Sequence, residues 1–91
     1  MAVKSAVISK LTSRFKPSSL LVIDESSLHR SHAAMKGLNA EETHFSVDIV
    51  SSEFSGISKL QRQRLVFSAL ADEMSASIHA LRMTCRAPDE P

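Results

Sequence analysis

The sequence predicts a two-layer α+β domain in which helices cover one face of a three-stranded mixed sheet. Two segments have the apolar spacing of a helix and three short segments indicate strands, in the order helix, strand, strand, helix, strand. Two strands joined by a loop pair antiparallel, whereas a helical crossover returns the chain parallel to the preceding strand and with a right hand. We therefore expect the third strand to run parallel to the second, with the helices packed on one face of the sheet.

The first helix is expected over residues 3–15. One helical face carries apolar residues four apart, namely Val3, Val7, Leu11 and Phe15. Pro17 ends the helix because it restricts the preceding residue away from the helical region. The segment has basic residues and no acidic one, so it also resembles a mitochondrial presequence. We favour a structural helix, because the strands that follow would otherwise lack a cover.

Strands are expected at residues 20–23, 43–50 and 78–85. The first is a short apolar run, and the second alternates polar residues with Phe45, Val47 and Ile49. The last is apolar at Leu81, Met83 and Cys85. The connector 26–42 is 17 residues long, which exceeds the roughly 12–15 residues expected of a structureless loop. Connectors of that length are usually functional or disordered.

A capping box opens the second helix, which is expected over roughly residues 58–75. The Ser58 hydroxyl and the Gln61 side chain close opposite ends of its first turn. An apolar face follows, formed by Leu65, Val66, Ala69, Leu70 and Met74. Residues 87–91 are expected to form a flexible tail. The chain 1–91 is thus expected to be a single domain with a core over about residues 3–86.

The composition excludes several classes of protein. Hydrophobic residues make up 43% and charged residues 23%, which is typical of a globular chain rather than a disordered one. No apolar run approaches the ~18 residues of a membrane span. Eleven basic and ten acidic residues give a net charge of +1, which alone indicates neither a nucleic-acid nor a membrane surface. A single cysteine excludes an internal disulfide and a zinc site built from cysteines.

Four histidines are the unusual feature of a chain without Trp or Tyr. His29 and His32 lie in the long connector, His44 begins the second expected strand and His79 the third. The expected topology brings the connector and both strand starts to one edge of the sheet. Neutral imidazoles suit zinc, copper and iron, although a surface or hydrogen-bonded role for each histidine stays open. Because few other ligands lie nearby, a partner that supplies thiolates fits better than a complete metal site on this chain.

Six motifs follow one another along the chain: Asp24-Glu25-Ser26, Glu42-Thr43-His44-Phe45, Val50-Ser51, Phe54-Ser55-Gly56-Ile57-Ser58, Arg62-Gln63-Arg64-Leu65-Val66 and His79-Ala80-Leu81. In this order and at this spacing they resemble the BolA-like family, in its histidine-type branch, over about residues 5–88. The resemblance implies an αββαβ fold similar to the class II KH domain, in agreement with the topology above.

The resemblance also implies a function and a set of site residues. BolA-like proteins form heterodimers with monothiol glutaredoxins and bridge a [2Fe-2S] cluster in iron–sulfur cluster assembly and trafficking and in iron or redox regulation. The glutaredoxin and its glutathione each supply a thiolate, and no cofactor is expected on the isolated chain. By resemblance His79 is the strand ligand and His29 the first choice for the loop ligand, with His32 and His44 as alternatives. Cys85 matches no ligand position, and we interpret it as an inward-facing apolar residue.

Nucleic-acid binding and catalysis are the other two classes of function to consider. A KH-like fold, bacterial relatives that regulate transcription, and the basic residues Lys59, Arg62 and Arg64 suggest nucleic-acid binding. Against it, a KH domain clamps the backbone through a Gly-x-x-Gly loop, Gly56 stands alone, and a solvated helix face explains the basic residues more simply. An enzyme is not expected, because the chain has no nucleophile elbow and little room for a pocket. The resemblance leaves the compartment open between the cytoplasm and, after loss of a transit peptide, the mitochondrion or plastid; no membrane association is expected.

Overall fold

The computed structural model describes residues 3–25, 44–76, 78 and 80–90. Its helices are α1 (Val3–Phe15), α2 (Lys59–Ala69) and α3 (Ala71–Ala76), with a short 3-10 helix η3 (Ser52–Phe54). Its strands are β1 (Ser19–Asp24), β2 (His44–Val50) and β3 (Ala80–Arg86). None of the helices in these ranges has the length and apolarity that crossing a membrane requires.

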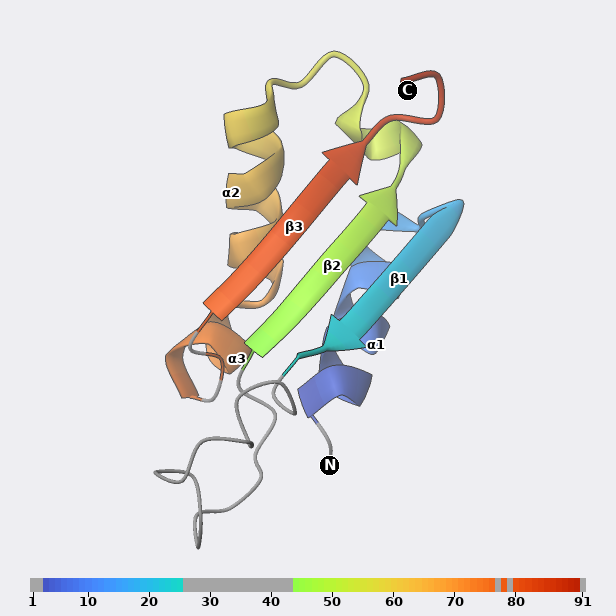
Figure 1. Ribbon diagram of the computed structural model, residues 1–91. Coiled ribbons are helices and arrows are strands. Elements are labelled where there is room, and N and C mark those ends of the chain that lie inside the picture. The colour runs from blue at the N-terminus through green and yellow to red at the C-terminus, as the bar shows by residue number, and fades with distance from the viewer. Residues whose placement is uncertain (1–2, 26–43, 77, 79, 91) are drawn as a thin grey trace, which may run out of the picture.

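The three strands form one mixed sheet in the order β1-β2-β3. β1 pairs antiparallel with β2, and β3 pairs parallel with β2. The helices lie together on one face of this sheet, behind the strands in Figure 1. The predicted two-layer α+β architecture and the predicted strand directions are therefore confirmed.

Helix α1 has the bounds that the apolar spacing predicts. Val7, Leu11 and Phe15 are buried along its inner face. The helix ends at Phe15, and the next residue, Lys16, has a φ of 47° in the left-handed region while its N–H still bonds the Thr12 carbonyl at 3.0 Å. Pro17, which disfavours a helical residue before it, follows directly.

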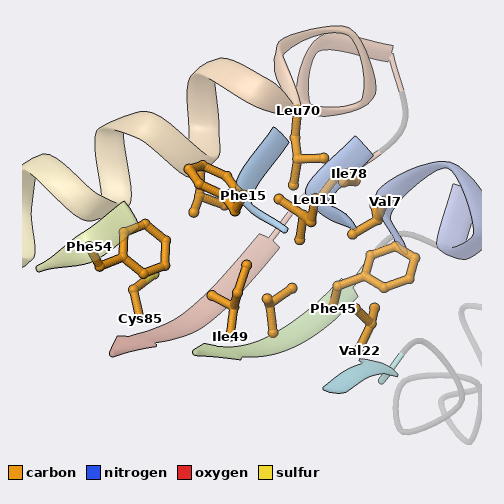
Figure 2. Packing of buried hydrophobic residues seen from close by; sticks show 12 residues of the cluster. Val7, Leu11, Phe15, Val22, Phe45, Ile49, Phe54, Leu70, Ile78 and Cys85 are labelled. Carbon is orange, nitrogen blue, oxygen red and sulfur yellow. The ribbon is translucent and has the colours of Figure 1, made fainter. Parts of the chain in front are cut away.

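The core fills the space between the helices and the sheet (Figure 2). Phe45, Val47 and Ile49 of β2 alternate inward, each no more than 1% exposed. The rings of Phe15 and Phe54 pack with centroids 5.1 Å apart. Cys85 is buried in the same cluster, as its inward-facing parity in β3 predicts.

The second helix differs from the prediction, because it is divided in two at Leu70. Leu70 caps α2 with φ −105° and ψ 20°, outside the helical region, and α3 follows at once. Its N–H bonds the carbonyls of both Val66 and Phe67, as in a tightened last turn. Its side chain is fully buried. The apolar spacing continues through this break, so the sequence alone indicated one helix.

Residues 87–90 also differ from the expected flexible tail. Ala87 is 1% exposed, and the Glu90 N–H bonds the Ala87 carbonyl at 3.1 Å, which closes a turn. The Glu90 carboxylate pairs with Arg62 of α2. This ion pair and the burial of Ala87 hold the turn against the domain.

Candidate functional site

The candidate metal-binding edge is the end of the sheet at which β1 ends and both β2 and β3 begin. His44 opens β2, and its register partner in β3 is Ala80. The Glu25 N–H, just after β1, donates to the His44 carbonyl at 2.8 Å. The end of β1 and the starts of β2 and β3 therefore share one edge (Figure 1). The sequence predicted this meeting of the strand ends from topology; the predicted convergence of the four histidines stays a prediction, because three of them lie outside the described residues.

Only one of the predicted ligands lies within the described residues. His44 is half-buried, and it alternates with the inward-facing Phe45, so it belongs to the sheet face that the helices leave open. His29, His32 and His79 lie outside the described residues, although His79 directly precedes Ala80 in the chain. The pairing of β2 with β3 places the start of β3 beside His44, but it does not decide which histidine is a ligand.

The described part of the chain shows no metal-binding cluster of side chains. It contains no group of three or more His, Cys, Asp and Glu side chains suitably gathered. Glu25, one of two acidic residues at this edge with Asp24, pairs with the Arg82 guanidinium at 2.5 Å. Cys85 lies at the other end of β3, where burial raises the pKa of its thiol to about 11. Its thiolate is therefore scarce at neutral pH.

The three basic residues of α2 are in different surroundings. Lys59 and Arg64 are exposed, as a solvated helix face requires. Arg62 is only 4% exposed, so the interpretation of these basic residues as a solvated helix face was wrong for Arg62. The physical reason is helical spacing: Arg62 stands four residues before the buried Val66 and eight before the buried Leu70, on the inward face. This spacing was the signal that could have identified it.

The Arg62 guanidinium donates four hydrogen bonds. Its Nε donates to the Ile57 carbonyl at 2.8 Å, and Nη1 donates to the Cys85 carbonyl at 3.0 Å. Nη1 and Nη2 also form a fork with the Glu90 carboxylate, at 2.6 and 2.7 Å. The hydrogen bond from Arg62, with a second from the Ala87 N–H, lowers the pKa of Glu90 to about 2. Arg62 thus joins α2, the preceding loop, β3 and the 87–90 turn.

Several proteins of known sequence and several solved structures are similar to this chain. The chain is 41% identical over 81 residues to chloroplastic BOLA1 of Arabidopsis thaliana, an alignment that covers 89% of this chain and 51% of that protein. It is 39% identical over 92 residues to the UV-induced protein uvi31 of Schizosaccharomyces pombe, covering 99% and 90%. It is 37% identical over 83 residues to the DNA-binding transcriptional regulator BolA of Escherichia coli, covering 91% and 73%.

The solved structure of BolA1 from Arabidopsis thaliana superposes with a TM-score of 0.88 at 37% identity, covering 100% of this chain and 98% of that one. The chain spans about half the length of the curated chloroplastic relative and nine tenths of the fission-yeast one. The family model for BolA-like protein matches residues 11–90. The chain therefore belongs to the BolA-like protein family.

Proposed function

We propose that this chain binds a monothiol glutaredoxin and supplies histidine ligands to a [2Fe-2S] cluster shared between the two proteins. The cluster would be cargo for iron–sulfur trafficking or a signal for iron and redox regulation. The chain would act as a binding protein and not as an enzyme. The observation that carries the proposal is the register of β2 and β3, in which His44 stands opposite Ala80, the residue after His79.

The side chains at this edge fit a cluster shared with a second protein better than a cluster whose ligands all come from this chain. The described residues offer the His44 imidazole, and their one thiol, Cys85, is buried at the far end of β3. Family resemblance assigns His79 and His29 as the two ligands from this chain, with His32 and His44 as alternatives for the second. The thiolates would then come from the glutaredoxin and its glutathione. Two imidazoles on one iron raise the reduction potential relative to an all-thiolate cluster.

Ligation by imidazole makes the proposed complex sensitive to pH. A histidine binds metal only in its neutral form, so protons compete with iron for each ligand. We expect the complex to lose its cluster as the pH falls through the range in which histidines become protonated, near pH 6–7. A cluster held by four thiolates would not show this response in the same range.

The test mixes the protein with a cluster-loaded monothiol glutaredoxin and follows visible circular dichroism. His79→Ala should abolish the spectrum of the mixed complex while the far-ultraviolet spectrum stays unchanged. Single alanine variants of His29, His32 and His44 then identify the second ligand as the one whose loss has the same effect. Gln61→Ala, exposed near the start of α2, is the control and should leave the visible spectrum intact. An unaltered visible spectrum for His79→Ala would refute the assignment.

Nucleic-acid binding is the second candidate, and the relative named as a DNA-binding transcriptional regulator favours it. Lys59 and Arg64 are exposed on α2 and available for phosphate contacts, whereas Arg62 is buried and occupied. Binding through two lysine or arginine contacts should weaken as salt increases. A labelled DNA that binds in the absence of glutaredoxin, and loses affinity in the Lys59→Gln, Arg64→Gln double variant, would support this function.

A further inference from the structure

The outer edge of β3 borders a groove that the proposed cluster site does not use. β3 is the last strand of the sheet, so within the described chain no further strand pairs with this edge. Two adjoining cavities, of about 670 and 500 Å³, lie along it between β3 and α2. They share Gln63, Met83 and Thr84 in their walls. The groove thus follows β3 for several residues.

The backbone of β3 presents hydrogen-bonding groups to this groove. Backbone groups of successive strand residues point to opposite sides. The Arg86 carbonyl bonds Ser51, just beyond β2, whereas the Cys85 carbonyl bonds Arg62 on the groove side. Met83 and Leu81 have the parity of Cys85, so their N–H and C=O groups face the groove. An exposed strand edge of this kind is a template for a further extended segment.

Three basic side chains gather at the end of the groove where Arg62 lies. Lys59 and Arg86 line the larger cavity with Arg62, and Glu90 is the acidic residue in its wall. Arg86 is paired with Asp48 at 3.0 Å, on the open face of the sheet. Lys59 is exposed and, with Arg62, lowers the pKa of Glu90. Because Arg62 and Arg86 are both paired with carboxylates, Lys59 supplies the remaining positive charge in this wall, and an incoming carboxylate would gain the Arg62 fork only by displacing Glu90.

Glu90 shows what kind of group this end of the groove accepts. Its two carboxylate oxygens take both prongs of the Arg62 fork, the planar geometry that guanidinium groups favour for carboxylates. The carboxylate also accepts from the Ala87 N–H, inside its own turn. It is 38% exposed and is held by a local turn rather than by deep packing. A carboxylate from another segment could replace it without disturbing the core.

We propose that the groove between α2 and β3 binds an extended acidic peptide segment of a partner protein, and that Glu90 occupies its carboxylate position until the partner displaces it. The peptide backbone pairs with the outer edge of β3, and one acidic side chain takes the Arg62 fork. The fork lies beside Cys85, five residues along β3 from Ala80, or about 17 Å from the candidate metal-binding edge. This inference therefore stands whether or not the chain carries a cluster.

The test compares two short peptides, one alternating Val with Glu and one alternating Val with Gln, on isotope-labelled protein by NMR. The Glu peptide should shift the amide signals of Leu81 and Met83 and the Nε–H signal of Arg62, and the Gln peptide should not. Glu90→Gln removes the internal competitor and should tighten binding of the Glu peptide several-fold. Adding Arg62→Met to that variant should abolish the gain.

Three results would overturn the proposal: equal binding of both peptides, no tightening in Glu90→Gln, or shifts that map away from the β3 edge. A single-stranded oligothymidylate that moves the same signals at lower concentration would instead assign the groove to nucleic acid. If Glu90→Gln does not fold, the same titration on the native chain tests the proposal. Displacement of Glu90 by the peptide requires the NMR signal of the Glu90 carboxyl carbon to move together with the Nε–H signal of Arg62. A Glu90 signal that stays fixed at saturation contradicts displacement.

Discussion

The buried hydroxyl of Ser51 connects the end of α1 to the loop after β2, and its removal gives a sharp test of the fold. Ser51 is completely buried. Its Oγ donates to the Phe15 carbonyl at 2.7 Å and accepts from the Glu53 N–H at 3.1 Å, which caps η3. Ser51→Ala therefore removes one donor and one acceptor at a site that water does not reach.

The expected cost is the sum of two known effects. Loss of a capping hydroxyl costs about 1 kcal/mol, and a buried carbonyl left without its donor costs about 1–3 kcal/mol. We expect Ser51→Ala to lower the free energy of unfolding by about 2–4 kcal/mol in total. For a domain of this size each kcal/mol lowers the melting temperature by about 4–8 °C.

Urea denaturation followed by far-ultraviolet circular dichroism measures this loss, with an unchanged m-value as evidence that the unfolding transition is the same. The control is Ser5→Ala, an exposed position on α1 where alanine favours the helix, so stability should stay within about 0.5 kcal/mol. If Ser51→Ala were as stable as Ser5→Ala, the reasoning from buried hydrogen bonds would be refuted.

Three further predictions concern the backbone, the thiol and the acidic turn. Gly56 has φ 76° with nothing within 4 Å of an added Cβ, so Gly56→Ala should cost about 1 kcal/mol in urea unfolding through backbone strain alone. Burial raises the pKa of Cys85 to about 11, so iodoacetamide at neutral pH should react far more slowly with the folded chain than with the urea-unfolded one; equal rates would contradict this. Arg62 lowers the pKa of Glu90 from 4.5 to about 2, so Glu90 contributes stability above pH 4.5 that is lost as the pH falls towards 2. Acid titrations of the native chain and Glu90→Gln should therefore converge at low pH, and a constant difference between them would exclude the linkage.

Local patterns in the sequence were sufficient for the elements that present one apolar face. The four-residue spacing through Leu11 predicts α1, and the alternation around Val47 predicts β2, because in each case burial on one side repeats with the period of the element. The strand directions followed from connectivity alone. Because these elements and directions are confirmed, the edge that holds His44 and Ala80 could be predicted from periodicity and connectivity together.

Features that depend on contacts distant in sequence were not predictable in the same way. The break at Leu70 keeps the apolar spacing of a helix, so periodicity does not reveal it. The pair of Arg62 and Glu90 joins residues 28 positions apart, and charge counting treats both as solvated. The ligand assignments for His29, His32 and His79 stay predictions from family resemblance, because these residues lie outside the described part of the chain.

The open face of the sheet is used by neither proposal: the cluster site lies where β2 and β3 begin, and the peptide groove lies along the outer side of β3. Two ion pairs from β3 lie on this face: Arg82 bonds Glu25 beyond the end of β1, and Arg86 bonds Asp48 on β2. Such cross-strand pairs let one face of a sheet stay in water, although Leu21 and Ile23 of β1 are 54% and 45% exposed there. The groups that the two proposals use lie elsewhere. His44 opens β2 and His79 precedes Ala80 in the chain, and the backbone groups with which no strand of the described residues pairs lie along the outer side of β3. Partners that satisfy these groups are therefore expected to approach along the edges of the sheet and not across its open face.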